Sequence, residues 1–363
     1  MFYANRHEFY KYELLTLQDG FYKHQRYVDD YVETGKIDVD FSRDIISNLS
    51  MELSDEAEIN YFADIIRPWY CLISQGITYE YALGTYMFSI PNKSSDGVLV
   101  NRSITGFDML LALDQDKLDA SMTISSGAVV TDEIESLLDT VGSWVQYKIE
   151  PSSSVLNKDM VFVIGDTKLS VINQLLEAIN YNPLFCTGKG VYRAIPWSNV
   201  PNITWTFEDN FQSLYESGVD VETDYSEVYN KVIMVADSLE EDAEAITSIK
   251  TMEDFGLDTH PLSFTSIGRY IEETFKVEAT SQANLDAMAE KEIYNMLQVE
   301  ESIKYKHAFV SSRPDNGLPW YGDCYKFKNA LLGADSVYKI DKMSMDLIVG
   351  SSVNSIIKQF KYI

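Results

Sequence analysis

Alternating apolar and polar residues dominate the chain from residue 35 to about residue 113. Two sets of apolar residues alternate with polar neighbours, first Ile37, Val39 and Phe41, then Leu49, Met51 and Leu53. A period of two puts every second side chain on one face of a strand, so both segments predict amphipathic strands. Strand signal continues at 65–73, 78–90 and 98–107, with turn residues at Gln75-Gly76 and Ser95-Asp96-Gly97. Strands at this regular spacing predict a small antiparallel barrel over 35–113.

The first 34 residues lack such a pattern. Aromatic residues are frequent there, but the apolar positions follow neither the helical nor the strand period for long. We therefore expect residues 1–34 to form an irregular N-terminal arm.

Residues 114–202 mix the two periods. One helix is expected near Asp132, with Glu135 three residues later as in a capping box, and a second at 167–180. The apolar face of the second helix consists of Leu169, Ile172, Leu175, Leu176 and Ile179. A strand pair at 184–185 and 191–195 follows, joined through Thr187-Gly188-Lys189-Gly190. These elements predict a middle α+β domain.

Strand patterns return at 203–208 and 228–236, and again from about residue 308 to the C-terminus. Between them lies an acidic, helix-biased segment with a long helix from Thr280 or Ser281. We expect 203–237 and 304–363 to form a second barrel-like domain, split by a helical α/β insertion at 238–303. The predicted fold class is α+β, mainly β, with two small antiparallel barrel-like domains and a middle α+β domain.

The charge balance limits the functions that the chain can have. Its 363 residues carry 56 acidic and 29 basic side chains, a net charge of −27 at pH 7, which repels a nucleic-acid backbone. The three cysteines, Cys71, Cys186 and Cys324, are far apart and predict free thiols rather than a disulfide framework. No apolar run approaches the length of a membrane span, and the N-terminus lacks a signal peptide, so we expect no membrane insertion and no secretion.

Motifs that could support catalysis or metal binding fail at specific positions. In Thr187-Gly188-Lys189-Gly190, the earlier glycine of a phosphate-binding loop falls at Pro183, so a hairpin turn is favoured. Asp114, Asp116 and Asp119 resemble the start of a calcium loop, but Leu118 stands where an oxygen ligand is needed. Carboxylate pairs such as Asp38/Asp40 are expected by chance among so many acids. We therefore assign no catalytic, cofactor-binding or metal-binding residue, and we expect no enzymatic activity.

Several phrases, in the same order, resemble the baseplate hub or tail-tip proteins of tailed phages. They are Asp64-Ile65-Ile66-Arg67-Pro68-Trp69-Tyr70, Leu83-Gly84-Thr85-Tyr86, Thr105-Gly106-Phe107-Asp108-Met109-Leu110, Ile164-Gly165-Asp166-Thr167, Tyr229-Asn230-Lys231-Val232, Gly268-Arg269 and Tyr321-Gly322-Asp323. The resemblance covers most of the chain. It marks eight structural positions, which are Arg67, Pro68, Gly84, Asp108, Gly165, Asn230, Gly322 and Asp323.

The resemblance implies a structural protein of the virion, made in the host cytoplasm. In such hubs three copies form a ring in which two similar barrels alternate, so that a six-fold tail tube can meet a three-fold spike or fibre. The implied partners are other copies of the chain, a tail tube or distal tail protein, and a spike, fibre or tape-measure protein, while DNA passes without specific binding. Because the chain ends at Ile363 in a predicted last strand, we expect no cell-wall-degrading domain.

Two other functions remain open from the sequence. The first is a carbohydrate- or peptidoglycan-cleaving enzyme on a β-rich scaffold, which needs two carboxylates facing one cleft. The second is the equivalent hub of a contractile injection or secretion machine, which has the same fold and is distinguished by its gene neighbourhood.

Overall fold

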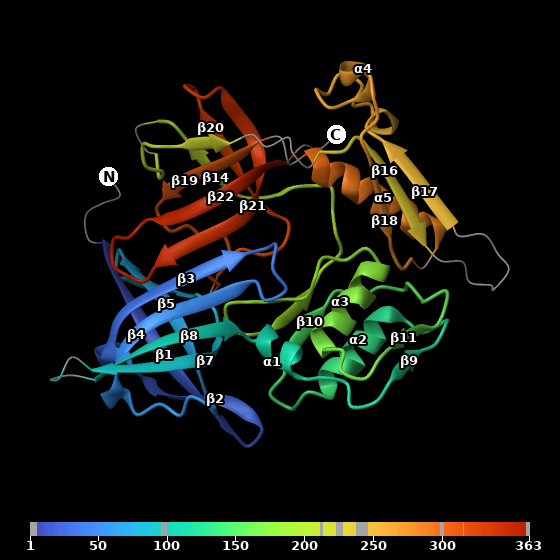
Figure 1. The fold of residues 1–363 in the computed structure, drawn as a ribbon. Helices are drawn as coiled ribbons and strands as arrows, with labels where there is room; N and C mark the ends of the chain where they lie inside the picture. The colour runs from blue at the N-terminus through green and yellow to red at the C-terminus, as the bar shows by residue number, and fades with distance from the viewer. Residues whose placement is uncertain are drawn as a thin grey trace.

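The computed structural model describes residues 6–95, 97, 100–210, 213–222, 228–236, 246–279, 281–297, 301–314 and 316–360. Strands provide most of the regular structure, and the α-helices gather in two smaller bodies beside a large sheet (Figure 1). This arrangement confirms the mainly β, α+β class expected from the sequence. No helix within these ranges is both long enough and apolar enough to cross a membrane.

Eight strands form the N-terminal half of the large sheet. They are β1 (Arg6–Gln18), β2 (Phe21–Tyr27), β3 (Val32–Asp40), β4 (Ser47–Ser54), β5 (Asp64–Ser74), β6 (Ile77–Ala82), β7 (Tyr86–Ser95) and β8 (Val100–Asp108), with the short 3-10 turns η1 (Asp29–Tyr31) and η2 (Asp55–Ala57). Their order is β3-β4-β8-β7-β5-β1-β2, all antiparallel, and β6 pairs with β5 beyond the end of β7. In β4, Leu49, Met51 and Leu53 are buried and alternate with more exposed neighbours, as their spacing predicted. Of the turns expected between these strands, Ser95-Asp96-Gly97 includes a position outside the described residues.

The expected irregular arm at 1–34 is wrong within the described residues. β1 pairs with β5 along eleven consecutive positions, from Arg6↔Ser74 to Thr16↔Asp64, and β2 pairs with β1. The alternation that marks a strand is missing because β1 is buried on both faces from Tyr12 to Leu15. Tyr12 and Leu14 enter one apolar core and Leu15 another. Residues 1–5 lie outside the described part of the chain.

Six strands form the C-terminal half of the sheet. They are β14 (Asn202–Glu208), β15 (Asp220–Glu222), β19 (Ser302–His307), β20 (Asp323–Asn329), β21 (Ala334–Asp346) and β22 (Val353–Phe360). The order β15-β19-β22-β21 is antiparallel, β20 pairs with β21, and β14 runs parallel to β20.

The long strand β21 joins the two halves into one sheet of fourteen strands (Figure 1). Residues 334–339 of β21 pair with β20, residues 342–346 pair with β3, and a bulge separates Ile340 from Lys342. The bulge adds one residue and so reverses which side chains face inward. Ile340 belongs to the apolar core of the C-terminal half, whereas Met343 and Met345 belong to that of the N-terminal half.

Two separate barrels, as expected from the sequence, are not found among the described strand pairings. The hydrogen-bonded order runs from β15 to β2 without closing on itself. Each half nevertheless bends over a core of its own. Leu14 of β1 and Ile37 of β3, from opposite ends of the N-terminal half, share one core, and Phe207, Tyr305 and Phe327 share the other.

The middle α+β body extends from α1 to β13. Its elements are α1 (Leu110–Gln115), β9 (Met122–Ile124), α2 (Val130–Asp139), β10 (Tyr147–Ile149), β11 (Met160–Phe162), α3 (Lys168–Ala178), β12 (Phe185–Cys186) and β13 (Tyr192–Ala194). Both expected helices are present, and the strand pair at 185–194 is antiparallel. Helix α2 begins earlier than the capping pattern suggested, because Val129 is its N-cap and Asp132 lies within its first turn.

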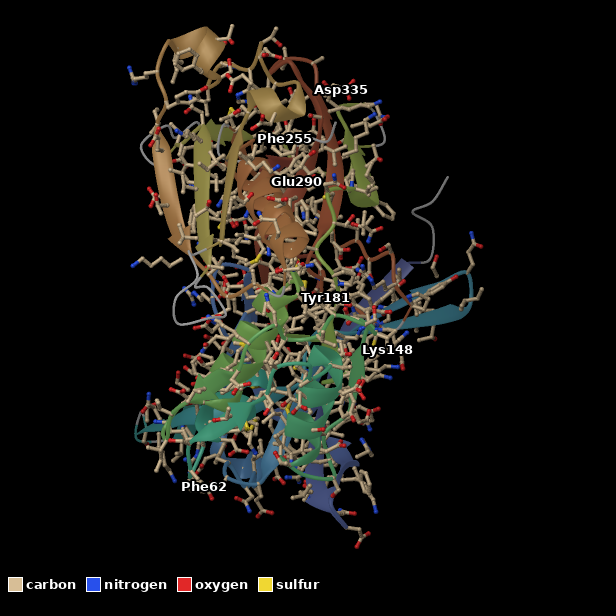
Figure 2. The ribbon with its side chains drawn as sticks, turned by 90° about the vertical axis from the view of Figure 1, so that its right-hand side faces the viewer. Phe62, Lys148, Tyr181, Phe255, Glu290 and Asp335 are labelled. Carbon is tan, nitrogen blue, oxygen red and sulfur yellow. The ribbon has the colours of Figure 1, made fainter. Side chains whose placement is uncertain are left out.

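The helical insertion contains a three-stranded sheet packed on one long helix. Its elements are β16 (Lys231–Ala236), β17 (Ile246–Thr251), η3 (Glu253–Phe255), α4 (Phe264–Ile267), β18 (Glu272–Lys276) and α5 (Gln282–Leu297). Figure 2 shows Phe255 and Glu290 in this body, and Tyr181 at the level where it meets the middle body. Within the expected insertion at 238–303, residues 238–245, 280 and 298–300 lie outside the described residues, so of the two expected starts of the long helix, Thr280 and Ser281, only Ser281 is described.

Strand β16, expected in the second barrel, belongs to the insertion instead. It pairs with β17 and β18, and none of the described strands of the large sheet contacts it through a ladder. Val232 and Met234 face Leu285 and Ile293 of α5 in one apolar core. A half-buried strand has the same alternation whichever sheet it joins, so the pattern alone does not identify its partners.

Candidate functional site

The structure brings Arg67, one of the family positions, to a junction of three segments. Arg67 on β5 donates from Nε to Oγ1 of Thr85 at 2.9 Å and from Nη2 to the carbonyl of Lys189 at 2.9 Å. Thr85, which precedes β7, donates in turn to the carbonyl of Gly188 at 3.0 Å. The large sheet is therefore tied to the β12–β13 hairpin of the middle body.

The third segment, around Asn316, reaches the same hairpin. The Gly188 amide donates to Oδ1 of Asn316 at 2.7 Å, while Gly317 donates to the carbonyl of Ala82 at 2.8 Å. A Cβ atom on Gly188 would lie only 2.1 Å from that carbonyl, so only glycine fits here. Because its amide already binds Asn316, this turn is not open to a phosphate group, in agreement with the hairpin favoured from the sequence.

The charge of Arg67 is balanced inside the junction. Its Nη1 lies 3.4 Å from Oε2 of Glu13, and both side chains are mostly buried. Glu13 also accepts from Nε1 of Trp69 at 2.9 Å. Burial lowers the pKa of Arg67, and the Glu13 carboxylate acts in the opposite direction. The pair thus keeps a charged guanidinium among buried groups. Removing only one of the two residues leaves the other charge buried and unpaired, so it lowers the stability of the protein more than removing both.

Asp323, another family position, anchors a second cluster near the start of β20. Its carboxylate accepts two hydrogen bonds from Arg313, at 2.5 and 2.6 Å, one from the Trp320 amide at 2.7 Å and one from Nδ2 of Asn202 at 2.9 Å. The guanidinium carbons of Arg313 and Arg193 lie 3.9 and 4.6 Å from the ring centroid of Trp320. With an exposed fraction of 2%, the Asp323 side chain depends on these donors.

Asp108 ends β8 directly before α1. Its carboxylate accepts from the amides of Leu110 and Ser47, at 2.9 and 3.1 Å. Complete burial raises the pKa of Asp108 to about 7, against these two hydrogen bonds. Next to it, the Tyr86 hydroxyl lies 2.8 Å from Oγ of Ser47 and donates to the carbonyl of Leu83 at 2.8 Å.

The other family positions lie in four different places. Gly84 has φ 124°, and the Tyr86 ring covers it. Beside it, the carbonyl of Pro68 accepts a hydrogen bond from the Leu83 amide at 2.9 Å. Asn230 ties the insertion together through Leu262, Arg269 and Ile271. Gly165 and Gly322 occupy turns with φ 96° and 80°. The eight positions therefore do not form one site.

Four residues that complete the two clusters were not singled out from the sequence. Thr85, Glu13, Asn316 and Arg313 meet their partners across 10 to 128 positions of the chain. No short motif spans such distances, and only the Leu83-Gly84-Thr85-Tyr86 phrase included one of them.

The junction and its neighbouring cluster can hold segments in place, and their polar atoms bind one another. Within the described residues no group of three His, Cys, Asp or Glu side chains is arranged to hold a metal ion. Of the three aspartates that resemble a calcium loop, Asp116 is paired with Lys168 at 2.6 Å.

No protein-family model matches the sequence, and no curated protein is similar to it. Solved structures do share its fold. A tail protein from Neisseria meningitidis MC58 superposes with a TM-score of 0.64 at 14% identity, covering 97% of each chain. The 43 kDa tail protein of prophage MuSo2 from Shewanella oneidensis superposes with a TM-score of 0.61 at 12% identity, covering 96% of this chain and 98% of the other.

A secretion-system protein has the same architecture with a lower score. This component of the type VI secretion system from E. coli, described as structurally similar to tail proteins of bacteriophage T4, has a TM-score of 0.50 at 9% identity, over 91% of this chain and 74% of the other. Over nearly its full length, the chain thus has the fold of these tail proteins, as the ordered phrases in its sequence predicted.

Proposed function

We propose that this protein is a structural hub of a phage-like tail, and that it has no catalytic role. The observation that carries the proposal is the fold, which two tail proteins, one of them from a prophage, share over at least 96% of this chain. The two clusters described above also support it, because their charged groups are used to hold segments of the protein together rather than to face a substrate.

The proposed assembly is a ring of three copies with pseudo-six-fold symmetry. Each chain contributes two bent half-sheets with separate cores, which would take the places of the two barrels of a hub. Three copies would therefore supply six half-sheets, the number of units that a six-fold tail tube requires.

The family positions would keep these units in a fixed orientation. Arg67 ties the N-terminal half-sheet to the middle body, and Asp323 ties the start of β20 to the loop that carries Arg313. Gly84, Asp108 and Pro68 shape the strand ends between them. A hub transmits force along the tail, so rigid connections between its parts have a direct mechanical use.

The two ends of the molecule fit the proposed position between two partners. Phe62 lies at one end and Asp335 at the other (Figure 2). Both ends expose large apolar side chains, since Phe62 is fully exposed and Leu331, in the turn before Asp335, has 97% exposure. Single exposed apolar side chains are common on protein surfaces, so these two residues serve as positions at which the proposed contacts can be tested. We assign one end to a tail tube or distal tail protein and the other to a spike, fibre or tape-measure protein, within the virion tail.

The net charge of −27 is consistent with DNA passage through such a ring. A wall of the same sign as the phosphates does not retain DNA. Duplex DNA should therefore show no binding to the ring in a gel-shift assay at about 0.15 M salt, and retention of DNA would contradict this part of the proposal.

Native mass spectrometry tests the assembly directly. The purified chain is measured alone and with the tail-tube protein encoded beside it. The expected species has three times the 41.4 kDa mass of one chain. The variants Phe62→Asp and Leu331→Asp change only exposed tips and should keep the thermal midpoint of the wild type, while one of them weakens binding of the tube protein. A monomer in both samples would refute the ring.

A hub of a secretion machine is the second candidate, because the E. coli secretion-system component shares the fold. The two functions differ in what surrounds the protein. Co-purification with a tail-tube and capsid set supports the phage tail, whereas co-purification with secretion-system sheath proteins and no capsid supports the second candidate.

A further inference from the structure

A cleft of about 270 Å³ lies beside the Asp323 cluster. It is lined by the linker after β13, which includes Trp197 and Val200, by the loop with Arg313 and Trp320, and by Lys339 of β21. None of the functions proposed above uses this cleft. It holds about nine water molecules at liquid density, enough for one side chain and too little for a nucleotide.

Lys339 has no ion pair and no hydrogen bond among the described residues, in contrast to Arg313, which binds Asp323 through two hydrogen bonds. Burial lowers the pKa of Lys339, because its ammonium group loses hydration. Its neighbour across the sheet, Lys358, adds repulsion and pairs instead with Asp341 at 3.3 Å. The Asp341 and Glu292 carboxylates act in the opposite direction, but neither forms an ion pair with Lys339 among the described residues. A partly buried ammonium group without an ion-pair partner is costly, and an anion in the cleft would relieve that cost.

Trp320, which lines the cleft, carries a second donor without a partner among the described residues. The indole Nε1 of Trp320 is buried and makes no hydrogen bond within the described part of the chain. Buried donors of this kind are rare, and an indole N–H can only donate. The ring itself is fixed by Arg193 and Arg313, whose guanidinium carbons lie within 5 Å of its centroid.

The acidic side chain that lines the cleft already accepts several hydrogen bonds. Asp323 is its one acidic residue among those described, and both carboxylate oxygens accept from Arg313, with further bonds from Asn202 and the Trp320 amide. Arg313, Lys339 and Asp323 give the lining a net charge of +1, in a chain whose total is −27. The cleft is thus a small positive site rich in donors on a strongly acidic protein.

We propose that this cleft binds a carboxylate group of an acidic segment from another polypeptide chain, with Lys339 as its counter-charge and the Trp320 indole as a donor. A polypeptide fits better than a free carboxylic acid, because Trp197 and Trp320 offer aromatic surface to the stem of the side chain. Val200 at the linker has 71% exposure and offers an apolar contact to a neighbouring residue. A phosphodiester chain is disfavoured by the net charge of the protein. The proposal concerns the single chain and holds whether or not the chain forms a ring.

Indole N–H signals in two-dimensional ¹⁵N NMR spectra provide the test, since the chain has five tryptophans and Trp320→Phe identifies one signal. The probes are acetyl-Ala-Glu-Ala-amide and its neutral match acetyl-Ala-Gln-Ala-amide, followed by acetate, inorganic phosphate and a thymidine oligonucleotide. The glutamate peptide should shift the Trp320 signal saturably, at least tenfold more tightly than the glutamine peptide or acetate.

Variants connect the response to Lys339. Lys339→Met should weaken the glutamate peptide at least tenfold, and Lys339→Arg should retain binding. Lys326→Met is the matched control, because Lys326 lies on the neighbouring strand β20 with a side chain that is 39% exposed. The remaining indole signals report whether each variant is folded. The proposal is overturned if the two peptides act alike on the wild type, if Lys339→Met and Lys326→Met bind equally, or if phosphate or the oligonucleotide binds more tightly than the glutamate peptide.

Discussion

Replacing His307 with glutamine should remove much of the acid sensitivity of the C-terminal half-sheet. His307 ends β19 and has 1% exposure. Its Nδ1–H donates to the carbonyl of Ala308 at 2.7 Å, since a carbonyl can only accept, and Nε2 therefore accepts from the Ser355 hydroxyl at 2.8 Å. Neutral imidazole satisfies both partners, and glutamine also has one donor and one acceptor group.

The size of this loss of stability follows from the difference in bound protons between the unfolded and the folded protein. Burial lowers the pKa of His307 from 6.5 to about 4. Between these values the unfolded chain binds a proton that the folded protein does not, so stability is present above pH 6.5 and is lost as the pH falls toward 4. At 1.36 kcal/mol per pH unit, the loss is about 3 kcal/mol. The rings of Phe207 and Tyr305, with centroids 4.7 and 5.1 Å from that of the imidazole, return only about 0.5 to 2 kcal/mol to the protonated form.

Urea unfolding at several pH values between 4 and 7 measures this effect. Between pH 7 and pH 4 the free energy of unfolding of the wild type should fall by about 3 kcal/mol relative to that of His307→Gln, in which the opposite contribution of Asp108 is unchanged. His7→Gln, which changes an exposed histidine on β1, is the control. An NMR titration of the imidazole Cε1–H signal gives the pKa independently. Equal pH slopes in wild type and His307→Gln, or a His307 midpoint near 6.5, would refute the reasoning.

Three further predictions concern the two clusters and the start of α1. Gly188→Ala puts a methyl group 2.1 Å from a backbone carbonyl and should cost about 2 kcal/mol or more of stability in thermal unfolding, whereas Gly106→Ala, whose nearest contact is 3.2 Å, should cost less; equal losses would contradict the steric argument. Arg313→Met leaves the Asp323 carboxylate buried without its counter-charge and should cost about 3 to 5 kcal/mol in urea unfolding, so a loss under about 1 kcal/mol would refute the role assigned to the pair. Because the pKa of Asp108 is raised to about 7, the folded protein takes up a proton between pH 7 and 3.8 and gains stability as the pH falls, a gain that Asp108→Asn should lack when unfolding is measured across the same range.

Strands with one buried face could be predicted from the sequence, and strands with two could not. In β4 the alternation of Leu49, Met51 and Leu53 reports a single core directly. In β1, Tyr12 and Leu15 face different cores, so the pattern resembles an irregular segment although it is one of the two longest strands of the sheet. The spacing of apolar residues along a strand shows whether one or both of its faces are buried. It does not show which other strand pairs with it.

The two clusters were predictable only in part for a related reason. Arg67 and Asp323 belong to phrases that the sequence itself displays, but their partners Thr85, Lys189 and Arg313 come from other segments. Hydrogen bonds between distant segments depend on how the large sheet and the middle body are placed against each other. That placement is set by packing of apolar cores, for which the sequence gives the residues but not the pairing.

The bulge in β21 explains how one sheet can serve two cores. Without it, Ile340 and Met343 would face opposite sides, because side chains three positions apart in a regular strand point in opposite directions. Because the bulge adds one residue, the Ile340 and Met343 side chains point to the same side of the sheet. The strand that pairs with β21 changes from β20 to β3 across the bulge. Since β22 follows β21 on both sides of the bulge, the two halves are joined by a continuous ladder rather than by a flexible linker. In the proposed ring, this ladder would hold the two units of each chain in one orientation, and assembly would set the orientation between chains.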